Sequence, residues 1–107
     1  MMKKVILCPN PYKDRGLKTT REAKALLEDA GFEVRVSPEL LDGRPDDWPE
    51  DLPISELEDV IDSAALVVSL GGDGTIMHTI HRLMGHSIPV IGVNLGTVGF
   101  LAELDRS

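Results

Sequence analysis

The sequence has one cysteine, no long apolar run and no surplus of basic residues. Cys8 is the only cysteine among 107 residues, so no disulfide can form within the chain, which fits a reducing compartment such as the cytoplasm. No apolar run approaches the ~20 residues that a membrane-spanning helix needs. The formal net charge of −7 argues against nucleic-acid and anionic-membrane partners, because both bind basic surfaces. A nucleotide ligand is still compatible with this charge, since backbone amides and Mg²⁺ can hold phosphates.

Length and composition indicate one soluble globular domain. A chain of 107 residues leaves no room for two domains of ordinary size. Hydrophobic residues make up 42% of the chain and charged residues 27%, which is typical of a globular protein. The amino-terminal segment MMKKVILCP lacks the longer apolar region and cleavage site of a signal peptide, and it predicts a first strand. There is no internal repeat, low-complexity tract or second-domain linker.

Apolar runs and helical periodicity alternate along the chain. Strands are predicted at residues 4–8, 32–36, 65–70 and 88–93. Three apolar stripes predict helices between them: Ala23, Leu26, Leu27 and Ala30; Leu57, Val60, Ile61 and Ala64; and Ile76, Met77, Ile80, Leu83 and Met84. Thr19 with Glu22, and Ser55 with Glu58, have the spacing of capping boxes. The order predicts an α/β fold: an open parallel, Rossmann-like sheet with helices on both faces, in three layers.

Residues 37–54 form a predicted loop with four prolines and six acidic residues. Loops of this length within a compact domain are uncommon and are often functional. Trp48, the only tryptophan, lies within it. Packing of Trp48 against the surface is the favoured interpretation, and contact with a partner or ligand is the alternative.

Three glycines surround one acid in SLGGDGTIMH, residues 69–78. A glycine turn between a buried strand and a helix brings backbone amides to the carboxyl edge of a parallel sheet, where ligands of such folds bind. Two common phosphate motifs are absent: no G-x-x-x-x-G-K-S/T occurs, and Met77 replaces the last glycine of G-x-G-x-x-G. Asp73 therefore has three candidate roles: holding Mg²⁺, accepting the proton of an attacking hydroxyl, or capping the helix.

A second glycine cluster follows the next predicted strand in GVNLGTVGFLAE, residues 92–103. It contains Gly96, with Asn94 at the strand's end and Phe100 in the loop. Loops at the ends of adjacent strands are expected to line one cleft, although each alone is compatible with an ordinary turn. Asn10, Tyr12 and Lys13 follow the first strand and are expected at the same edge, where a turn is favoured over a nucleotide contact.

These segments together resemble the NAD kinase family. GGDGT, residues 71–75, is similar to a signature shared by NAD kinases, diacylglycerol and sphingosine kinases and, in related form, phosphofructokinases. The segment GVNLGTVGFLAE resembles the G-I/V-N-x-G-x-x-G-F-L stretch of NAD kinases, and CPNPYKD resembles their first strand and turn. The resemblance covers essentially the whole chain and implies a phosphofructokinase-like sheet.

The resemblance implies ATP-dependent phosphorylation of the adenosine-ribose 2′-hydroxyl of NAD, giving NADP. Asp73 would activate or orient that hydroxyl for attack on the γ-phosphate of ATP. ATP and Mg²⁺ are the implied cofactors, and the full-length protein is expected to be a homo-oligomer. The other implied site residues contact the dinucleotide or shape its loops: Gly72, Gly74 and Thr75 as the phosphate and ribose cradle, Phe100 and Met77 as apolar contacts, and Asn94 and Gly96 in the adjoining loop.

One part of the family pattern is missing. NAD kinases have a second, strand-rich domain with an Asn-Glu pair for the substrate's ribose, and this sequence contains no Asn-Glu dipeptide. Residues 1–107 are therefore predicted to be the amino-terminal domain, with little or no activity alone. Two alternatives are a lipid or sugar kinase of the same superfamily, and a non-catalytic nucleotide-binding or regulatory module.

Three histidines raise the question of a metal site. His78 and His81 are predicted on the polar side of the third helix, and His86 follows it. A solvated helix face is favoured over a zinc site, so no metal ligands are assigned. His78, nearest the glycines, is a possible ligand contact.

Overall fold

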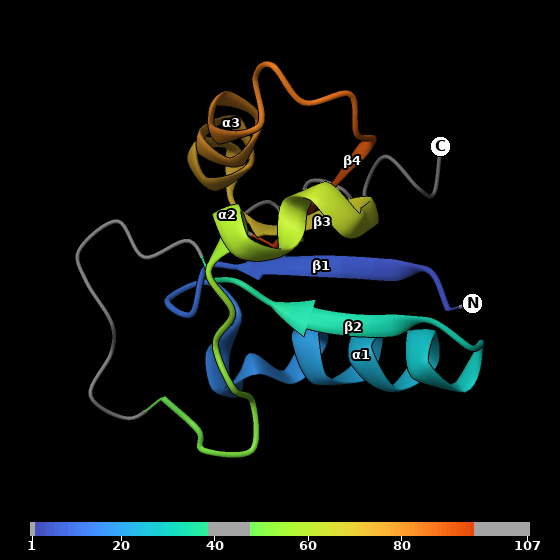
Figure 1. The fold of residues 1–107 in the computed structure, drawn as a ribbon. Helices are drawn as coiled ribbons and strands as arrows, with labels where there is room; N and C mark the ends of the chain where they lie inside the picture. The colour runs from blue at the N-terminus through green and yellow to red at the C-terminus, as the bar shows by residue number, and fades with distance from the viewer. Residues whose placement is uncertain (1, 39–47, 96–107) are drawn as a thin grey trace, which may run out of the picture.

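Four parallel strands form one sheet in the computed structural model, which describes residues 2–38 and 48–95 (Figure 1). The strands are β1 (Lys4–Pro9), β2 (Glu33–Val36), β3 (Ala64–Gly71) and β4 (Val90–Asn94). The helices between them are α1 (Lys18–Asp29), α2 (Leu57–Val60) and α3 (Asp73–Arg82), with short 3-10 turns at η1 (Arg15–Leu17) and η2 (Ile61–Ser63). The predicted α/β fold with a parallel sheet is confirmed.

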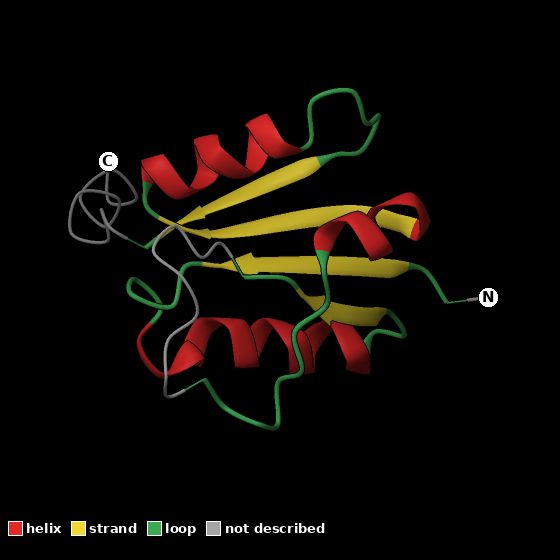
Figure 2. Ribbon diagram, turned by 60° about the vertical axis from the view of Figure 1, so that its left-hand side comes forward, coloured by secondary structure: helices red, strands yellow, loops and turns green. Residues whose placement is uncertain are grey.

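The strand order is β2-β1-β3-β4. From β1 the chain runs outward to β2, then returns across β1 to β3 and continues to β4. The direction of winding therefore reverses between β1 and β3. All four carboxyl ends point to one edge of the sheet (Figure 2). In open α/β sheets, the loops that follow the two strands at such a reversal diverge and leave a crevice where ligands bind.

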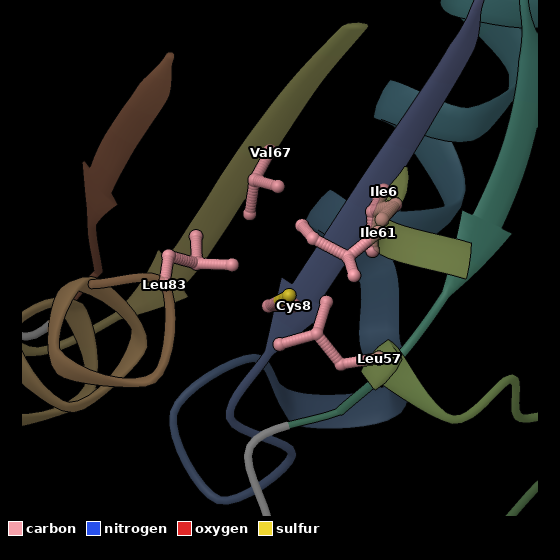
Figure 3. Packing of buried hydrophobic residues seen from close by; sticks show 6 residues of the cluster. All are labelled: Ile6, Cys8, Leu57, Ile61, Val67 and Leu83. Carbon is pink, nitrogen blue, oxygen red and sulfur yellow. The ribbon is translucent and has the colours of Figure 1, made fainter. Parts of the chain in front are cut away.

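Alternating residues of β1 supply both faces of the core. Val5 and Leu7 pack with Val34 and Leu70 on the face covered by α1. Side chains in a strand alternate between faces, so Ile6 and Cys8 point the other way. There they meet a cluster contributed by α2, the turn after it, β3 and the end of α3, drawn in Figure 3: Leu57, Ile61, Val67 and Leu83. Helices thus cover both faces, and the three-layer prediction is confirmed.

A third cluster fastens the segment before α2. Trp48 is buried with Leu17, Val36 and Leu52, and its indole Nε1 donates a hydrogen bond to the carbonyl of Leu52 at 2.7 Å. The packing interpretation of Trp48 is therefore confirmed. Residues 39–47 of the predicted loop lie outside the described residues.

Both predicted capping boxes are wrong. α1 begins at Lys18 after Leu17, so Thr19 lies inside the helix rather than at its N-cap. Asp14 caps the helix from outside instead: its carboxylate accepts the backbone amides of Thr19 and Thr20 at 2.9 and 2.8 Å. α2 begins at Leu57 after Glu56, without a side-chain cap, so the Ser55–Glu58 spacing is likewise not used.

The predicted apolar stripe of α3 is partly wrong. Leu83 is buried, but the side chains of Met77, Ile80 and Met84 are 51%, 39% and 72% exposed. The buried positions are Thr75, Thr79 and Leu83, spaced four residues apart. The pattern of apolar residues misses this face because it counts threonine as polar.

The buried threonines are satisfied by local hydrogen bonds. The Thr79 hydroxyl donates to the carbonyl of Thr75 at 3.0 Å and lies 3.1 Å from the Ser69 hydroxyl on β3. A buried hydroxyl with such partners avoids the cost of desolvation. Across the described residues, none of the helices has the length and apolar character needed to cross a membrane.

Candidate functional site

The GGDGT segment (residues 71–75) joins β3 to α3 at the carboxyl edge of the sheet. β3 ends at Gly71, Gly72 is extended at the N-cap, and Asp73 is the first residue of α3. No side chain caps α3. The first hydrogen bond of the helix runs from the backbone amide of Ile76 to the carbonyl of Gly72 at 3.0 Å. The capping interpretation of Asp73 is therefore wrong. Its side chain is exposed at the edge where ligands of such sheets bind.

Asp73 and Asn94 meet across the ends of β3 and β4. The parallel register pairs Gly71 with Asn94, and the Leu95 amide donates to the Gly71 carbonyl at 2.7 Å. From this position the side-chain amide of Asn94 donates a hydrogen bond to Oδ1 of Asp73. Oδ2 of Asp73 accepts no hydrogen bond from the rest of the described chain. The structure thus brings together one residue from each predicted glycine loop, with Gly96 and Phe100 of the second loop outside the described residues.

Two glycines near the site lie in close packing contacts. A Cβ at Gly71 would lie 2.7 to 2.8 Å from three side-chain atoms of Thr75. A Cβ at Gly92 would lie 3.0 to 3.3 Å from three side-chain atoms of Ile76. A side chain at Gly71 would therefore force α3 and β3 to shift, whereas one at Gly92 would require the Ile76 side chain to move by a few tenths of an ångström.

Gly72 and Gly74 differ from those two because they have room for a side chain. Nothing lies within 4 Å of a Cβ at Gly74, and the only atom near a Cβ at Gly72 is Lys13 Cε at 3.6 Å. Packing therefore does not explain these glycines. The predicted close approach of a ligand to the backbone at these glycines stays a prediction.

The turn after β1, residues 10–14, is hydrogen-bonded to the GGDGT segment and is called the first turn from here on. The side-chain amide of Asn10 donates to the Thr75 hydroxyl at 2.9 Å, and the Thr75 side chain is buried. This contact was missed from the sequence, which predicts Asn10 only at the same edge. The adjacency of β1 and β3 is the information that would have suggested it.

The predicted histidines do not form a metal site in the described residues. His78 and His81 are exposed on α3, and no cluster of three metal-binding side chains occurs within residues 2–38 and 48–95. His78 and Arg82 line a hollow of about 290 Å³ together with residues 37–38 and 54–56. Met77 is half-exposed on the surface of α3.

An open parallel sheet with an exposed acid beside two unobstructed glycines defines a Rossmann-like α/β domain with its candidate site at the carboxyl edge. The family model described as the ATP-NAD kinase N-terminal domain matches residues 5–107. The chain therefore belongs to the NAD kinase family.

Individual relatives agree with this assignment. The chain is 39% identical over 105 residues to the NAD kinase of Lachnoclostridium phytofermentans, an alignment that covers 97% of this chain and 34% of the relative. It is 32% identical over 106 residues to the NAD kinase of Agathobacter rectalis, covering 99% and 35%. A shorter alignment of 55 residues is 49% identical to the NAD kinase of Heliobacterium modesticaldum, covering 51% and 19%. The chain thus spans about a third of the length of the first two relatives.

Proposed function

We propose that this chain carries the catalytic acid and the phosphate-binding backbone of an enzyme that phosphorylates NAD. The γ-phosphate of ATP would be transferred to the 2′-hydroxyl of the adenosine ribose, giving NADP. The observation that carries the proposal is the exposed Asp73 carboxylate, held at one oxygen by Asn94 beside two glycines with open surfaces. Family membership and the names of the relatives support the reaction class.

Asp73 is the proposed proton acceptor for the attacking hydroxyl. The bond from Asn94 restrains the carboxylate and leaves Oδ2 without a hydrogen bond from the described chain. Such a restrained carboxylate is suited to orient a hydroxyl and take its proton, a contribution of about 10²- to 10⁴-fold in rate for general-base catalysis. The acid in this segment is thus explained by the acceptor hydroxyl rather than by the phosphates.

The remaining predicted site residues keep the roles that the resemblance implies. Gly72 and Gly74 present backbone amides to the phosphates, and Thr75 supports the cradle through its buried side chain. Met77 is an exposed apolar contact for the dinucleotide. Gly96 and Phe100 stay in the proposed site as predictions, as does the role of Asn94 in shaping the second loop.

The Mg²⁺ implied with ATP fits a shared site rather than a cage made by the protein. Mg²⁺ in nucleotide enzymes is commonly bound by one or two carboxylates plus substrate phosphates. Asp73 is the carboxylate of the GGDGT segment, and the described residues hold no cluster of three metal-binding groups. The metal ion would therefore arrive on the phosphates and offset their charge, while Asp73 serves the attacking hydroxyl.

The chain alone is proposed to have little or no activity. Its relatives are about three times as long, and the family resemblance implies a strand-rich domain that contacts the substrate's ribose. A cytoplasmic location and homo-oligomerisation of the full-length protein belong to the same proposal.

A hybrid enzyme tests the proposal. Residues 1–107 would replace the matching third of the Lachnoclostridium phytofermentans enzyme, and NADP formation from NAD, ATP and Mg²⁺ would be followed. We expect the hybrid to be active and the 107-residue chain to be inactive. Asp73→Asn in the hybrid should lower kcat by about 10²- to 10⁴-fold. Asp62→Asn, an exposed acid at the opposite end of β3, is the matched control and should leave kcat unchanged.

Other outcomes identify the alternatives. An Asp73→Asn hybrid with normal kcat would exclude a catalytic role for Asp73. Binding of NAD by both variants without turnover would favour a non-catalytic nucleotide-binding module. Phosphorylation of a lipid or sugar in place of NAD would place the chain with other kinases of the superfamily. NADP formation by the 107-residue chain would contradict the proposal that this chain is inactive alone.

A further inference from the structure

The GGDGT segment contains an acid and no basic residue, although the proposed ligands carry several negative charges. Backbone amides can bind phosphate, but a carboxylate in the same segment opposes that binding by repulsion. A cation from elsewhere in the fold would offset the repulsion. The first turn, some sixty residues earlier in the chain, brings one to this place.

Hydrogen bonds attach the first turn to the site. The Asn10 amide donates to the Leu70 carbonyl at 2.8 Å, which joins the turn to the end of β3. The Asn10 side chain donates to the Thr75 hydroxyl at 2.9 Å, which joins residues 10–14 to the start of α3. Within the turn, the backbone amide of Lys13 donates to the Asn10 carbonyl at 3.0 Å. The backbone of Lys13 is therefore held in a defined position relative to residues 70–75.

The side chain of Lys13 lies against Gly72. Its Cε is 3.6 Å from the point that a Cβ on Gly72 would occupy. The residue is exposed, and within the described chain its ammonium group forms no ion pair, whereas Lys24 pairs with Glu28 at 3.1 Å. Lys13 thus brings a positive charge beside Gly72.

The topology adds an independent reason for this position. β1 and β3 are the two strands between which the winding reverses, and their loops are the first turn and the GGDGT segment. Ligands of open parallel sheets lie in the crevice between these two loops, so Lys13 and the GGDGT segment border the same crevice. Lysine is a common partner of phosphate as a point charge.

We propose that Lys13 binds the phosphate group at the GGDGT segment and supplies the positive charge that the segment lacks. The inference rests on the proposed function in one respect, because it takes this segment as the place where phosphates bind. It assigns a ligand contact to a residue for which the sequence favoured an ordinary turn.

Titration of the 107-residue chain with sodium tripolyphosphate tests the proposal without requiring turnover. Binding would be followed at constant ionic strength by NMR, through the backbone amides of Gly72, Asp73 and Gly74. Lys13→Ala should weaken binding by about tenfold, the effect of losing one charge-assisted contact. Lys13→Arg should restore most of the affinity. Lys18→Ala, an exposed lysine at the start of α1, should match the parent chain.

Three results would overturn the inference: equal affinity in Lys13→Ala and the parent chain, equal weakening by Lys13→Ala and Lys18→Ala, or no shift of the three amides at saturating tripolyphosphate. The outcome is separable from that of the hybrid enzyme. If the hybrid forms no NADP while Lys13→Ala selectively weakens tripolyphosphate binding, the role of Lys13 stands and the proposed reaction is wrong.

Discussion

The starts of α1 and α3 use the same residue type in opposite ways. Both helices follow a parallel strand at one edge of the sheet, and an aspartate accompanies each start. Asp14 is 3% exposed and accepts hydrogen bonds from the Thr19 amide, the Thr20 amide and the Thr20 hydroxyl. Asp73 is exposed, caps nothing, and accepts a single hydrogen bond, from Asn94.

This difference separates a structural acid from a candidate functional acid. The carboxylate of Asp14 is buried and hydrogen-bonded to Thr19 and Thr20, so Asp14 has a structural role at the start of α1. Asp73 has one oxygen that accepts no hydrogen bond from the described chain, and its side chain does not cap α3. The comparison predicts that substitutions at the two positions will have opposite effects on stability and activity.

Loss of the Asp14 carboxylate is expected to have the largest effect on stability. Asp14→Ala removes the cap of α1 and leaves the buried Thr20 without its partner, which should lower the free energy of unfolding by about 2–3 kcal/mol. Urea denaturation of the 107-residue chain would measure the change. Asp14→Asn retains one acceptor oxygen and should cost less. A loss below about 0.5 kcal/mol, the range of ordinary surface substitutions, would contradict the structural role of Asp14.

A methyl group at Gly71 should have the next largest effect. Gly71→Ala places a Cβ against the Thr75 side chain, and overpacking of this kind costs about 1–3 kcal/mol. Gly72→Ala is the matched control, since only the flexible Lys13 side chain lies near its Cβ. We expect thermal unfolding to show a clear loss for Gly71→Ala and little change for Gly72→Ala. Equal losses would mean that both glycines are required by packing.

Substitution of Asp73 should affect stability much less than substitution of Asp14. Asp73→Ala removes a favourable interaction with the amino terminus of α3, worth less than about 1 kcal/mol at an exposed position. The same urea denaturation should therefore give nearly parental stability, in contrast to the large loss of kcat expected for the Asp73→Asn hybrid. A stability loss as large as that of Asp14→Ala would show that Asp73 is a structural residue after all.

The Arg21–Asp51 ion pair should have the smallest effect. The hydrogen bond from Arg21 lowers the pKa of the Asp51 carboxyl, and the same bond raises the pKa of Arg21. A lowered folded-state pKa means that any stabilisation by Asp51 is present above its unfolded pKa and is lost as the pH falls through the acid range. Because the pair is exposed, solvent screens it, and Asp51→Asn should leave the stability unchanged within experimental error. A distinct loss at neutral pH that disappears on acidification would contradict this.

Much of the fold and part of the site could be predicted from local patterns. The four strands, the three helices and the parallel sheet follow from apolar runs alternating with helical periodicity, because burial of these runs dominates folding. The GGDGT segment was located correctly at the edge of the sheet. Asp73 and Asn94, from the two glycine segments, are in contact because β3 and β4 are neighbours, and a cleft lined by the two loops stays a prediction.

The wrong predictions fall where a residue's partner is set by position in space. Thr19 and Ser55 have the spacing of capping residues, yet the side chain of Asp14 caps α1 and no side chain caps α2. The buried face of α3 was missed because Thr75 and Thr79 find hydroxyl and amide partners on β3 and in the first turn.

By itself the sequence determined the class of fold, the glycine turn with its acid, and the family, because these depend on residues close together along the chain. Only the tertiary structure decided that Asn10 supports Thr75 and that Lys13 lies beside Gly72. β1 and β3 are neighbours in the sheet although β2 lies between them in the sequence. That strand order puts Lys13 of the first turn beside Gly72 of the GGDGT segment, and no local pattern contains this neighbourhood.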